Sequence, residues 1–233
     1  MKKILIADKM SVQAEKVFNA NGISFDRKVG LSEDAICKII NEYEGIVVRS
    51  ATKITKKIIQ AGSKLKVLGR AGIGVDNIDI EAATNNGIVV MNTPFGNSIT
   101  TAEHTISLMM SLARNIPQAS KSTKEGKWEK SKFMGTELFG KTLGMIGCGN
   151  IGSLVAEKSM GLKMKVIVYD PFVSEEQLNK IGAKKVELKE IFKLADFITL
   201  HTPLTSETKG ILNKKTMLEC KKGVRIINCA RGG

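Results

Sequence analysis

Residues 141–170 read KTLGMIGCGNIGSLVAEKSMGLKMKVIVYD and contain the clearest structural pattern of the chain. An apolar run at 142–147 is followed by a helical pattern at 150–160 and by a second apolar run at 165–170. Three glycines separate the first run from the helical pattern with the spacing G-x-G-x-x-G. They are Gly147, Gly149 and Gly152. A strand, a glycine turn, a helix and a second strand predict one βαβ unit with parallel strands.

Each of these glycines suits a turn that receives a dinucleotide. Gly147 permits a tight turn, Gly149 lets the backbone approach a pyrophosphate, and Gly152 lets helix and strand pack closely. The start of the helix adds partial positive charge and N–H donors. Asp170, 18 residues beyond Gly152, stands where an acid can hold the adenosine ribose and repel a 2′-phosphate. The pattern favours NAD over NADP, and the alternative is an ordinary glycine-containing turn.

Outward from this unit, short apolar runs alternate with amphipathic stretches. Before it, strands are expected at 4–7, 23–25, 45–48, 66–69 and 88–90, and helices at 11–21, 32–41, 55–61 and 79–86. After it, strands are expected at 184–187, 196–201 and 224–229. This alternation predicts an α/β protein with two doubly wound parallel sheets. We place the boundary between the domains 1–96 and 97–233.

A long helix is expected at 98–116, directly after that boundary. Its apolar residues fall on one stripe. They are Ile99, Ala102, Ile106, Met109, Met110 and Ala113. A polar, lysine-rich segment follows at 120–132 and contains Trp128.

The composition excludes several classes of protein. A formal charge of +13 comes mostly from scattered lysines, and aromatic residues are only 5%, so a specific nucleic-acid surface is not expected. The longest apolar runs are shorter than the about 18 residues of a membrane span, so no membrane partner is expected. Four cysteines without CxxC spacing indicate a reducing, cytoplasmic location and no metal site.

A second glycine loop, GRAGIGVDNID, occupies residues 69–79. Gly72 and Gly74 match the first two glycines of the dinucleotide pattern, but Asn77 replaces the third, and no acid ends the next strand. The loop can offer backbone N–H groups to a small anion such as a carboxylate. A purely structural turn is the alternative.

Six motifs together carry a resemblance to a known family. They are VRSATKIT (48–55), GRAGIGVDNID (69–79), MNTPFGNSITTAEHT (91–105), KFMGTELFGKTLGMIGCGNIG (132–152), DFITLHTPLTSETKGILN (196–213) and NCARGG (228–233). Together they resemble the D-isomer-specific 2-hydroxyacid dehydrogenases, most of all the members that act on 3-phosphoglycerate. The resemblance implies a flavodoxin-like substrate domain followed by an incomplete Rossmann domain. It also implies oxidation of 3-phosphoglycerate to 3-phosphohydroxypyruvate with NAD, in serine biosynthesis.

The resemblance also implies roles for single residues. Arg231 matches the catalytic arginine, which holds the carboxylate and carbonyl oxygens of the substrate. The positions that match dinucleotide contacts are Gly147, Gly149, Asn150, Ile151, Gly152, Asp170, Thr202, Cys229, Ala230 and Arg231. The positions that match substrate contacts are Arg49, Gly72, Gly74, Val75 and Asn97. Arg49 is the candidate for a substrate phosphate.

Hydride transfer also needs a base, which in this family is a histidine oriented by a glutamate, both after the NCARGG motif. His104 is expected to be a packing or hinge residue, and His201 a wall of the cofactor site. We therefore expect the chain to be part of a longer product with little activity alone, and a homodimer or higher oligomer when complete. The alternatives are a glyoxylate or hydroxypyruvate reductase of the same family and a non-catalytic NAD-sensing scaffold.

Overall fold

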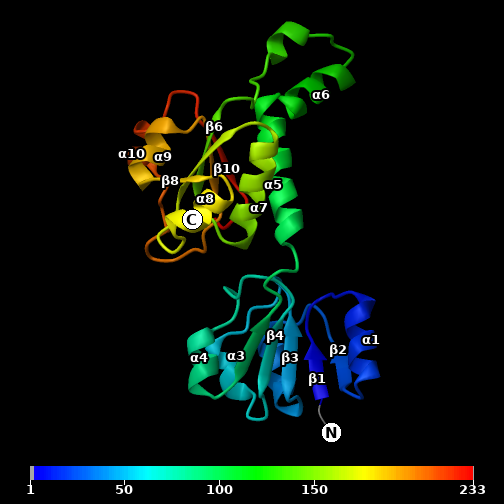
Figure 1. Ribbon diagram of the computed structural model, residues 1–233. Helices are drawn as coiled ribbons and strands as arrows, with labels where there is room; N and C mark the ends of the chain where they lie inside the picture. The colour runs from blue at the N-terminus through cyan, green and yellow to red at the C-terminus, as the bar shows by residue number, and fades with distance from the viewer. Residues whose placement is uncertain (1–2, 233) are drawn as a thin grey trace. The chain divides into compact units, whose positions relative to one another are not determined.

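The computed structural model describes residues 3–232, so Gly233, the last residue of the NCARGG motif, lies outside the described part. The chain divides into two compact units, residues 1–97 and 98–233. This division falls one residue after the boundary expected from the sequence. Figure 1 shows that each unit contains its own sheet with helices around it.

Unit 1 is a parallel five-stranded sheet in the order β2-β1-β3-β4-β5. Its strands are β1 (Lys3–Ile6), β2 (Ser24–Arg27), β3 (Gly45–Val48), β4 (Val67–Arg70) and β5 (Val89–Asn92). Its helices are α1 (Val12–Ala20), α2 (Glu33–Ile39), the 3-10 turn η1 (Ile40–Glu42), α3 (Lys56–Ala61) and α4 (Ile80–Asn85). This is the flavodoxin-like strand order.

One face of the unit 1 sheet is well covered. Leu5, Ile46 and Leu68 from the strands pack with apolar residues of α2, α3 and α4 in one core cluster. At the edge strand β5, Val89 and Met91 remain 58% and 56% exposed. Helix α1 has no buried residue. The main core of this unit therefore lies between the sheet and the helices α2, α3 and α4.

Unit 2 is a second parallel sheet, in the order β10-β9-β6-β7-β8. Its strands are β6 (Thr142–Ile146), β7 (Lys165–Tyr169), β8 (Lys184–Lys185), β9 (Phe197–Leu200) and β10 (Arg225–Asn228). Its helices are α5 (Ser98–Ala113), α6 (Ile116–Lys124), η2 (Lys130–Phe133), α7 (Asn150–Gly161), α8 (Glu175–Lys180), α9 (Leu188–Leu194) and α10 (Lys214–Leu218). Strand order reverses between β6 and β9, which is the switch point of the Rossmann arrangement. The predicted fold class is confirmed.

Helices cover both faces of the unit 2 sheet. Residues of α5, α7 and α8 pack on one face, and residues of α9 pack on the other. Gly144 in β6 makes room for α9, because a Cβ at this position would lie 2.7 Å from the Cβ of Ala195. In Figure 1, α6 extends away from the sheet of its unit at the end of α5.

Two local expectations were wrong. The helix expected at 98–116 ends at Ala113, because Asn115 adopts a left-handed conformation with φ of 53° before α6 begins. The apolar stripe of this helix is only partly buried, since Ile99 and Met110 are exposed while Ser98 and Thr105 are buried. The strand expected at 184–187 is reduced to two residues in β8.

The other expected elements are present, with their ends shifted by one or two residues. Asp79 caps α4, since its carboxylate accepts the Ala82 N–H at 2.9 Å. Gly87, beyond the end of α4, has a positive φ of 66°. Among residues 3–232, no helix combines the length and the apolar character that crossing a membrane requires.

Candidate functional site

The glycine turn of unit 2 joins β6 to α7 with very little free space. Gly147 has φ of 92°, and a Cβ there would lie 2.8 Å from the carbonyl oxygen of His201. A Cβ on Gly152 would lie 2.7 Å from the carbonyl oxygen of Gly147. A Cβ on Gly149, by contrast, would meet nothing within 4 Å. Gly147 and Gly152 are thus required by the protein itself, whereas Gly149 faces open space.

The first turn of α7 has the properties of an anion site. Gly149 is the N-cap residue, and no side chain caps the helix. The first amides of a helix have no acceptor within the helix, so amides near Asn150 and Ile151 remain available to a ligand. The helix dipole adds partial positive charge at the same place. Asn150 is exposed and Ile151 is half-buried.

Asp170 lies directly beside this turn and is only 8% exposed. Its Oδ2 accepts the N–H of Cys148 at 2.7 Å, and its Oδ1 accepts the N–H groups of Phe172 at 2.8 Å and Val173 at 3.3 Å. A carboxylate has about four acceptor sites, so acceptor capacity remains for a ribose hydroxyl. The carboxylate therefore shapes the turn and keeps acceptor capacity for a ligand.

The loop after β9 approaches the glycine turn from the other side. Thr202 is half-buried, and its Cγ2 would lie 2.9 Å from a Cβ on Gly147. Burial lowers the pKa of His201 to about 4, and its Nε2 lies 3.1 Å from the Thr199 hydroxyl. The imidazole is thus neutral at physiological pH, which suits a wall of a site better than a proton carrier.

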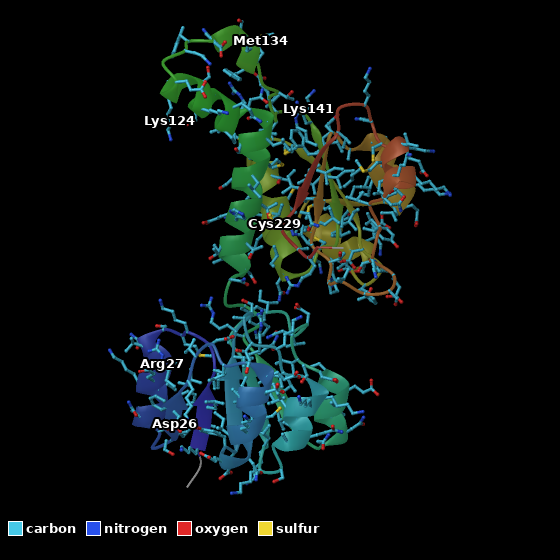
Figure 2. The ribbon with its side chains drawn as sticks, turned by 180° about the vertical axis from the view of Figure 1, so that it is seen from behind. Asp26, Arg27, Lys124, Met134, Lys141 and Cys229 are labelled. Atoms are coloured by element: carbon cyan, nitrogen blue, oxygen red, sulfur yellow. The ribbon has the colours of Figure 1, made fainter. Side chains whose placement is uncertain are left out.

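The end of β10 carries the arginine of the NCARGG motif. The Asn228 side chain accepts the Ala230 N–H at 3.0 Å and donates to the Arg231 carbonyl at 2.8 Å, which holds the turn in place. Arg231 is exposed. It lines an open groove of about 540 Å³ between the end of β10 and α5, together with Cys229 and His104. Figure 2 labels Cys229 in unit 2. His104 is exposed at this groove and is not buried in the core.

In unit 1, Arg49 stands at the carboxyl end of β3, in the loop 49–52. Asp8, which is 4% exposed at the end of β1, anchors this loop. Its Oδ2 accepts the Arg49 N–H at 2.6 Å, and its Oδ1 accepts the Thr52 hydroxyl at 2.6 Å. Burial tends to raise the pKa of Asp8, but the hydrogen bonds from Thr52 and from nearby backbone amides outweigh it, so the pKa lies below its usual value.

The second glycine loop follows β4 at the same edge of the sheet. Gly72, Gly74 and Val75 are half-buried. The guanidinium of Arg70 lies across Gly72, because a Cβ on Gly72 would be 1.7 Å from its Nη1. Asn97, the last residue of unit 1, follows β5 and is exposed.

The predicted residues therefore gather in two sets, one in each unit. Unit 2 brings the expected dinucleotide residues and Arg231 to the carboxyl ends of β6, β7, β9 and β10. Unit 1 brings the expected substrate residues to the carboxyl ends of β3, β4 and β5. Among residues 3–232, no three His, Cys, Asp or Glu side chains are grouped to hold a metal ion.

Four residues beside these sets were not singled out from the sequence: Asp8, Arg70, Phe172 and Asn228. Asp8 and Asn228 hold loops through hydrogen bonds, and Arg70 adds a guanidinium at the end of β4 with a buried, unpartnered Nε. Phe172, beside the Asp170 carboxylate, is 94% exposed. The signal for Phe172 was an aromatic residue two positions after the acid of the dinucleotide pattern.

Comparison with known proteins identifies the family to which this chain is similar. Residues 106–233 match the family profile described as D-isomer specific 2-hydroxyacid dehydrogenase, NAD binding domain. The whole chain is 51% identical to D-3-phosphoglycerate dehydrogenase of Homo sapiens and 52% identical to that of Synechocystis sp.. It spans only 44% and 42% of the lengths of these two relatives.

Solved structures also match nearly the whole chain. The NAD+-bound 3-phosphoglycerate dehydrogenase of Entamoeba histolytica matches 98% of this chain with 35% identity and a TM-score of 0.81, and the match covers 72% of that protein. The TT0316 protein of Thermus thermophilus matches 99% of this chain with 28% identity and a TM-score of 0.90, and the match covers 74% of that protein. NAD as the cofactor is thus confirmed at the level of the family. The chain belongs to the D-isomer specific 2-hydroxyacid dehydrogenase family.

Proposed function

We propose that this chain carries the substrate-binding and NAD-binding residues of an enzyme that oxidises 3-phosphoglycerate to 3-phosphohydroxypyruvate. Identity of about half the residues, across the whole chain, to curated D-3-phosphoglycerate dehydrogenases supports this most directly. In this proposal, unit 1 binds the substrate and unit 2 binds NAD, which accepts the hydride.

The pose of NAD follows from the carboxyl edge of unit 2. The pyrophosphate lies at the first turn of α7, where Gly149 leaves space, and one ribose lies at Asp170. Thr202, Cys229 and Ala230 would hold the nicotinamide end of NAD. Cys229 and Ala230 directly precede Arg231 in the chain.

Arg231 supplies the charge for binding and polarising the substrate. A guanidinium is planar, stays charged and can hold two oxygens at once, which suits an α-hydroxy acid or α-keto acid. It would bind the carboxylate and the oxygen on C2 and stabilise the negative charge that develops there. In unit 1, backbone amides of Gly72–Val75 would meet a carboxylate, and Arg49 would meet the phosphate.

The substrate class is tested by replacing Arg49. In Arg49→Gln the affinity for 3-phosphoglycerate should fall about tenfold or more, because a charge-assisted hydrogen bond to the phosphate is lost. The affinity for D-glycerate, which lacks the phosphate, should stay within about twofold. Isothermal titration calorimetry with each acid, in the presence of NADH, measures both values.

Arg27→Gln is the matched control, because Arg27 belongs to the same unit but pairs with Glu15 at 3.1 Å. It should leave both affinities unchanged. Equal losses for both acids in Arg49→Gln would remove the phosphate role. Tighter binding of glyoxylate or hydroxypyruvate than of 3-phosphoglycerate by the unaltered chain would overturn the proposed substrate.

We also propose that the protein is a homodimer that uses the surface formed by α5, α6 and η2. Exposed apolar side chains concentrate on this surface, and such surfaces mark sites of association. They include Leu112 at 43%, Ile116 at 51%, Trp128 at 84% and Met134 at 83% exposure. Figure 2 shows Lys124 and Met134 on the segment that extends away from the sheet of unit 2.

Sedimentation equilibrium tests this association. The unaltered chain should sediment as a dimer at micromolar concentration, and the double variant Trp128→Glu, Met134→Glu should sediment as a monomer. Leu218→Glu, which places the same charge at an 80% exposed position on α10, should remain a dimer. A dimeric double variant would exclude this surface.

We further propose a cytoplasmic location. All four cysteines are free thiols, and each of them is buried or half-buried without a disulfide partner, which fits a reducing compartment. Fractionation of cells that express the tagged chain would place it, and recovery in an oxidising compartment would contradict the proposal.

A further inference from the structure

The side chain of Asn77 ties together the two loops of unit 1 that carry the expected substrate residues. Its Nδ2 donates to the carbonyl oxygens of Arg49 at 2.7 Å and Thr52 at 2.6 Å. The backbone continues the connection, since the Ile54 N–H donates to the Asn77 carbonyl at 2.8 Å. An isolated parallel bridge between Ile54 and Ile78 lies beside it. The Arg49 loop and the second glycine loop are therefore joined at several points.

Asp8 holds the same loop from the other side. Its carboxylate accepts the N–H of Arg49 at 2.6 Å, the N–H of Thr52 at 3.2 Å and the Thr52 hydroxyl at 2.6 Å. The backbone of Arg49 is thus fixed at both of its polar groups, with the N–H bound to Asp8 and the carbonyl bound to Asn77. Its side chain makes one long hydrogen bond, from Nη1 to the Lys9 carbonyl at 3.4 Å.

The connection between the two loops depends on the amide group of Asn77. Its Oδ1 is buried and has no hydrogen-bond partner. A buried amide oxygen without a partner is destabilising. The two hydrogen bonds that Nδ2 donates offset this cost. Two carbonyl oxygens need two N–H donors, and the NH2 group of an asparagine supplies both. A carboxylate supplies none. An aspartate would place negative charge against the same carbonyl oxygens.

We propose that Asp8 and Asn77 are positioning residues that fix the separation between Arg49 and the backbone of Gly72–Val75. The inference rests on the proposed function, in which Arg49 meets the phosphate and the glycine loop meets the carboxylate. A fixed separation selects acids by the length of the carbon chain between the two anionic groups. The pair therefore determines specificity for a three-carbon phosphorylated acid, without touching the acid itself.

The test compares ligands of different length in Asn77→Ala. The unaltered chain should bind 3-phosphoglycerate more tightly than 2-phosphoglycolate, which is one carbon shorter. In Asn77→Ala the affinity for 3-phosphoglycerate should fall about tenfold, because a small displacement of a binding group is costly. The affinities for 2-phosphoglycolate and D-glycerate should stay within about twofold, so that the length preference largely disappears.

Asn86→Ala is the matched control. Asn86 also donates from Nδ2 to a carbonyl, that of Ala82 at 2.8 Å, but it does so at the end of α4, away from the carboxyl edge. Urea titration should show comparable destabilisation in the two variants. Only Asn77→Ala should change the length preference. If Asn77 were only structural, Asn77→Ala would lower the apparent affinity for all three acids alike, because a smaller fraction of the protein would be folded.

Thr52→Val gives a second route if Asn77→Ala folds poorly. It removes the hydroxyl that donates to Asp8 and keeps the shape of the side chain. It should reduce the length preference in the same direction by a smaller factor. Binding is measured by calorimetry, and the NMR signal of the Arg49 Nε–H reports whether its guanidinium still responds to 3-phosphoglycerate.

The outcomes separate the two proposals. If the unaltered chain shows no preference for 3-phosphoglycerate over D-glycerate, the proposed substrate is wrong and this inference falls with it. Suppose instead that the unaltered chain prefers 3-phosphoglycerate to D-glycerate, and that Asn77→Ala and Thr52→Val still prefer 3-phosphoglycerate to 2-phosphoglycolate as strongly as the unaltered chain does. The positioning role is then wrong, while the proposed substrate stands. Loss of length selection in either folded variant supports the role.

Discussion

Gly149→Val should abolish saturable binding of NADH at micromolar concentration while leaving the fold intact. A Cβ at this position meets nothing within 4 Å, and the backbone is extended, with φ −75° and ψ −154°. Folding should therefore change by less than about 1 kcal/mol. In the proposed pose, the valine side chain occupies the space that the pyrophosphate needs. Losing two charge-assisted bonds from backbone amides would weaken binding by more than about a hundredfold.

Gly161→Val is the control for this experiment. Gly161 ends the same helix, and a Cβ there also meets nothing within 4 Å. It should bind NADH as tightly as the unaltered chain. Titration followed by NADH fluorescence gives the affinities, and urea denaturation gives the free energy of unfolding. Unchanged NADH affinity in a folded Gly149→Val would show that the cofactor does not lie at this turn.

Asp170→Ala should affect both folding and cofactor choice. Removing the carboxylate leaves the N–H groups of Cys148, Phe172 and Val173 without their acceptor, which should lower the free energy of unfolding by about 3 kcal/mol. Loss of the bonds to the ribose should weaken NADH binding by about a hundredfold. The preference for NADH over NADPH should also shrink, because no negative charge then repels the 2′-phosphate.

Asp196→Ala separates the two effects. Asp196 is also a half-buried carboxylate of unit 2 that accepts a backbone amide, that of Thr142 at 2.8 Å, but it stands before β9, at the amino end of the sheet. Its loss should destabilise the fold without changing the ratio of NADH to NADPH affinity. Calorimetry with both nucleotides decides the matter, and an unchanged ratio in Asp170→Ala would remove Asp170 from cofactor selection.

Much of the candidate nucleotide site of unit 2 could be predicted, because its residues lie close together in the chain. Gly147 needs a positive φ, and Gly152 lies too close to the Gly147 carbonyl for a side chain. Both requirements can be recognised within six residues of sequence. The helix that follows and the acid at the next strand end complete a pattern of about 30 residues. What the pattern did not reveal is that Asp170 is also a structural anchor of the turn.

The packing of α5 shows where periodicity was insufficient. Its apolar residues are numerous enough to define more than one stripe, and the sequence does not say which face meets the sheet. Thr105 is fully buried because its hydroxyl donates to the Thr101 carbonyl at 2.9 Å within the same helix, so burial leaves no polar group unpaired. Met110 belongs to the apolar stripe and is nevertheless 37% exposed.

The two parallel α/β units, the glycine turn and the strand ends that carry the candidate residues could all be read from the sequence, because periodicity and glycine conformation are properties of short segments. The contacts by which Asp8 and Asn77 hold Arg49 from both sides became visible only in the folded chain. These contacts join residues 41 and 28 positions apart, and they exist only because β1, β3 and β4 are neighbours in the sheet. Hydrogen bonds at such separations depend on strand order, which no short segment of sequence encodes.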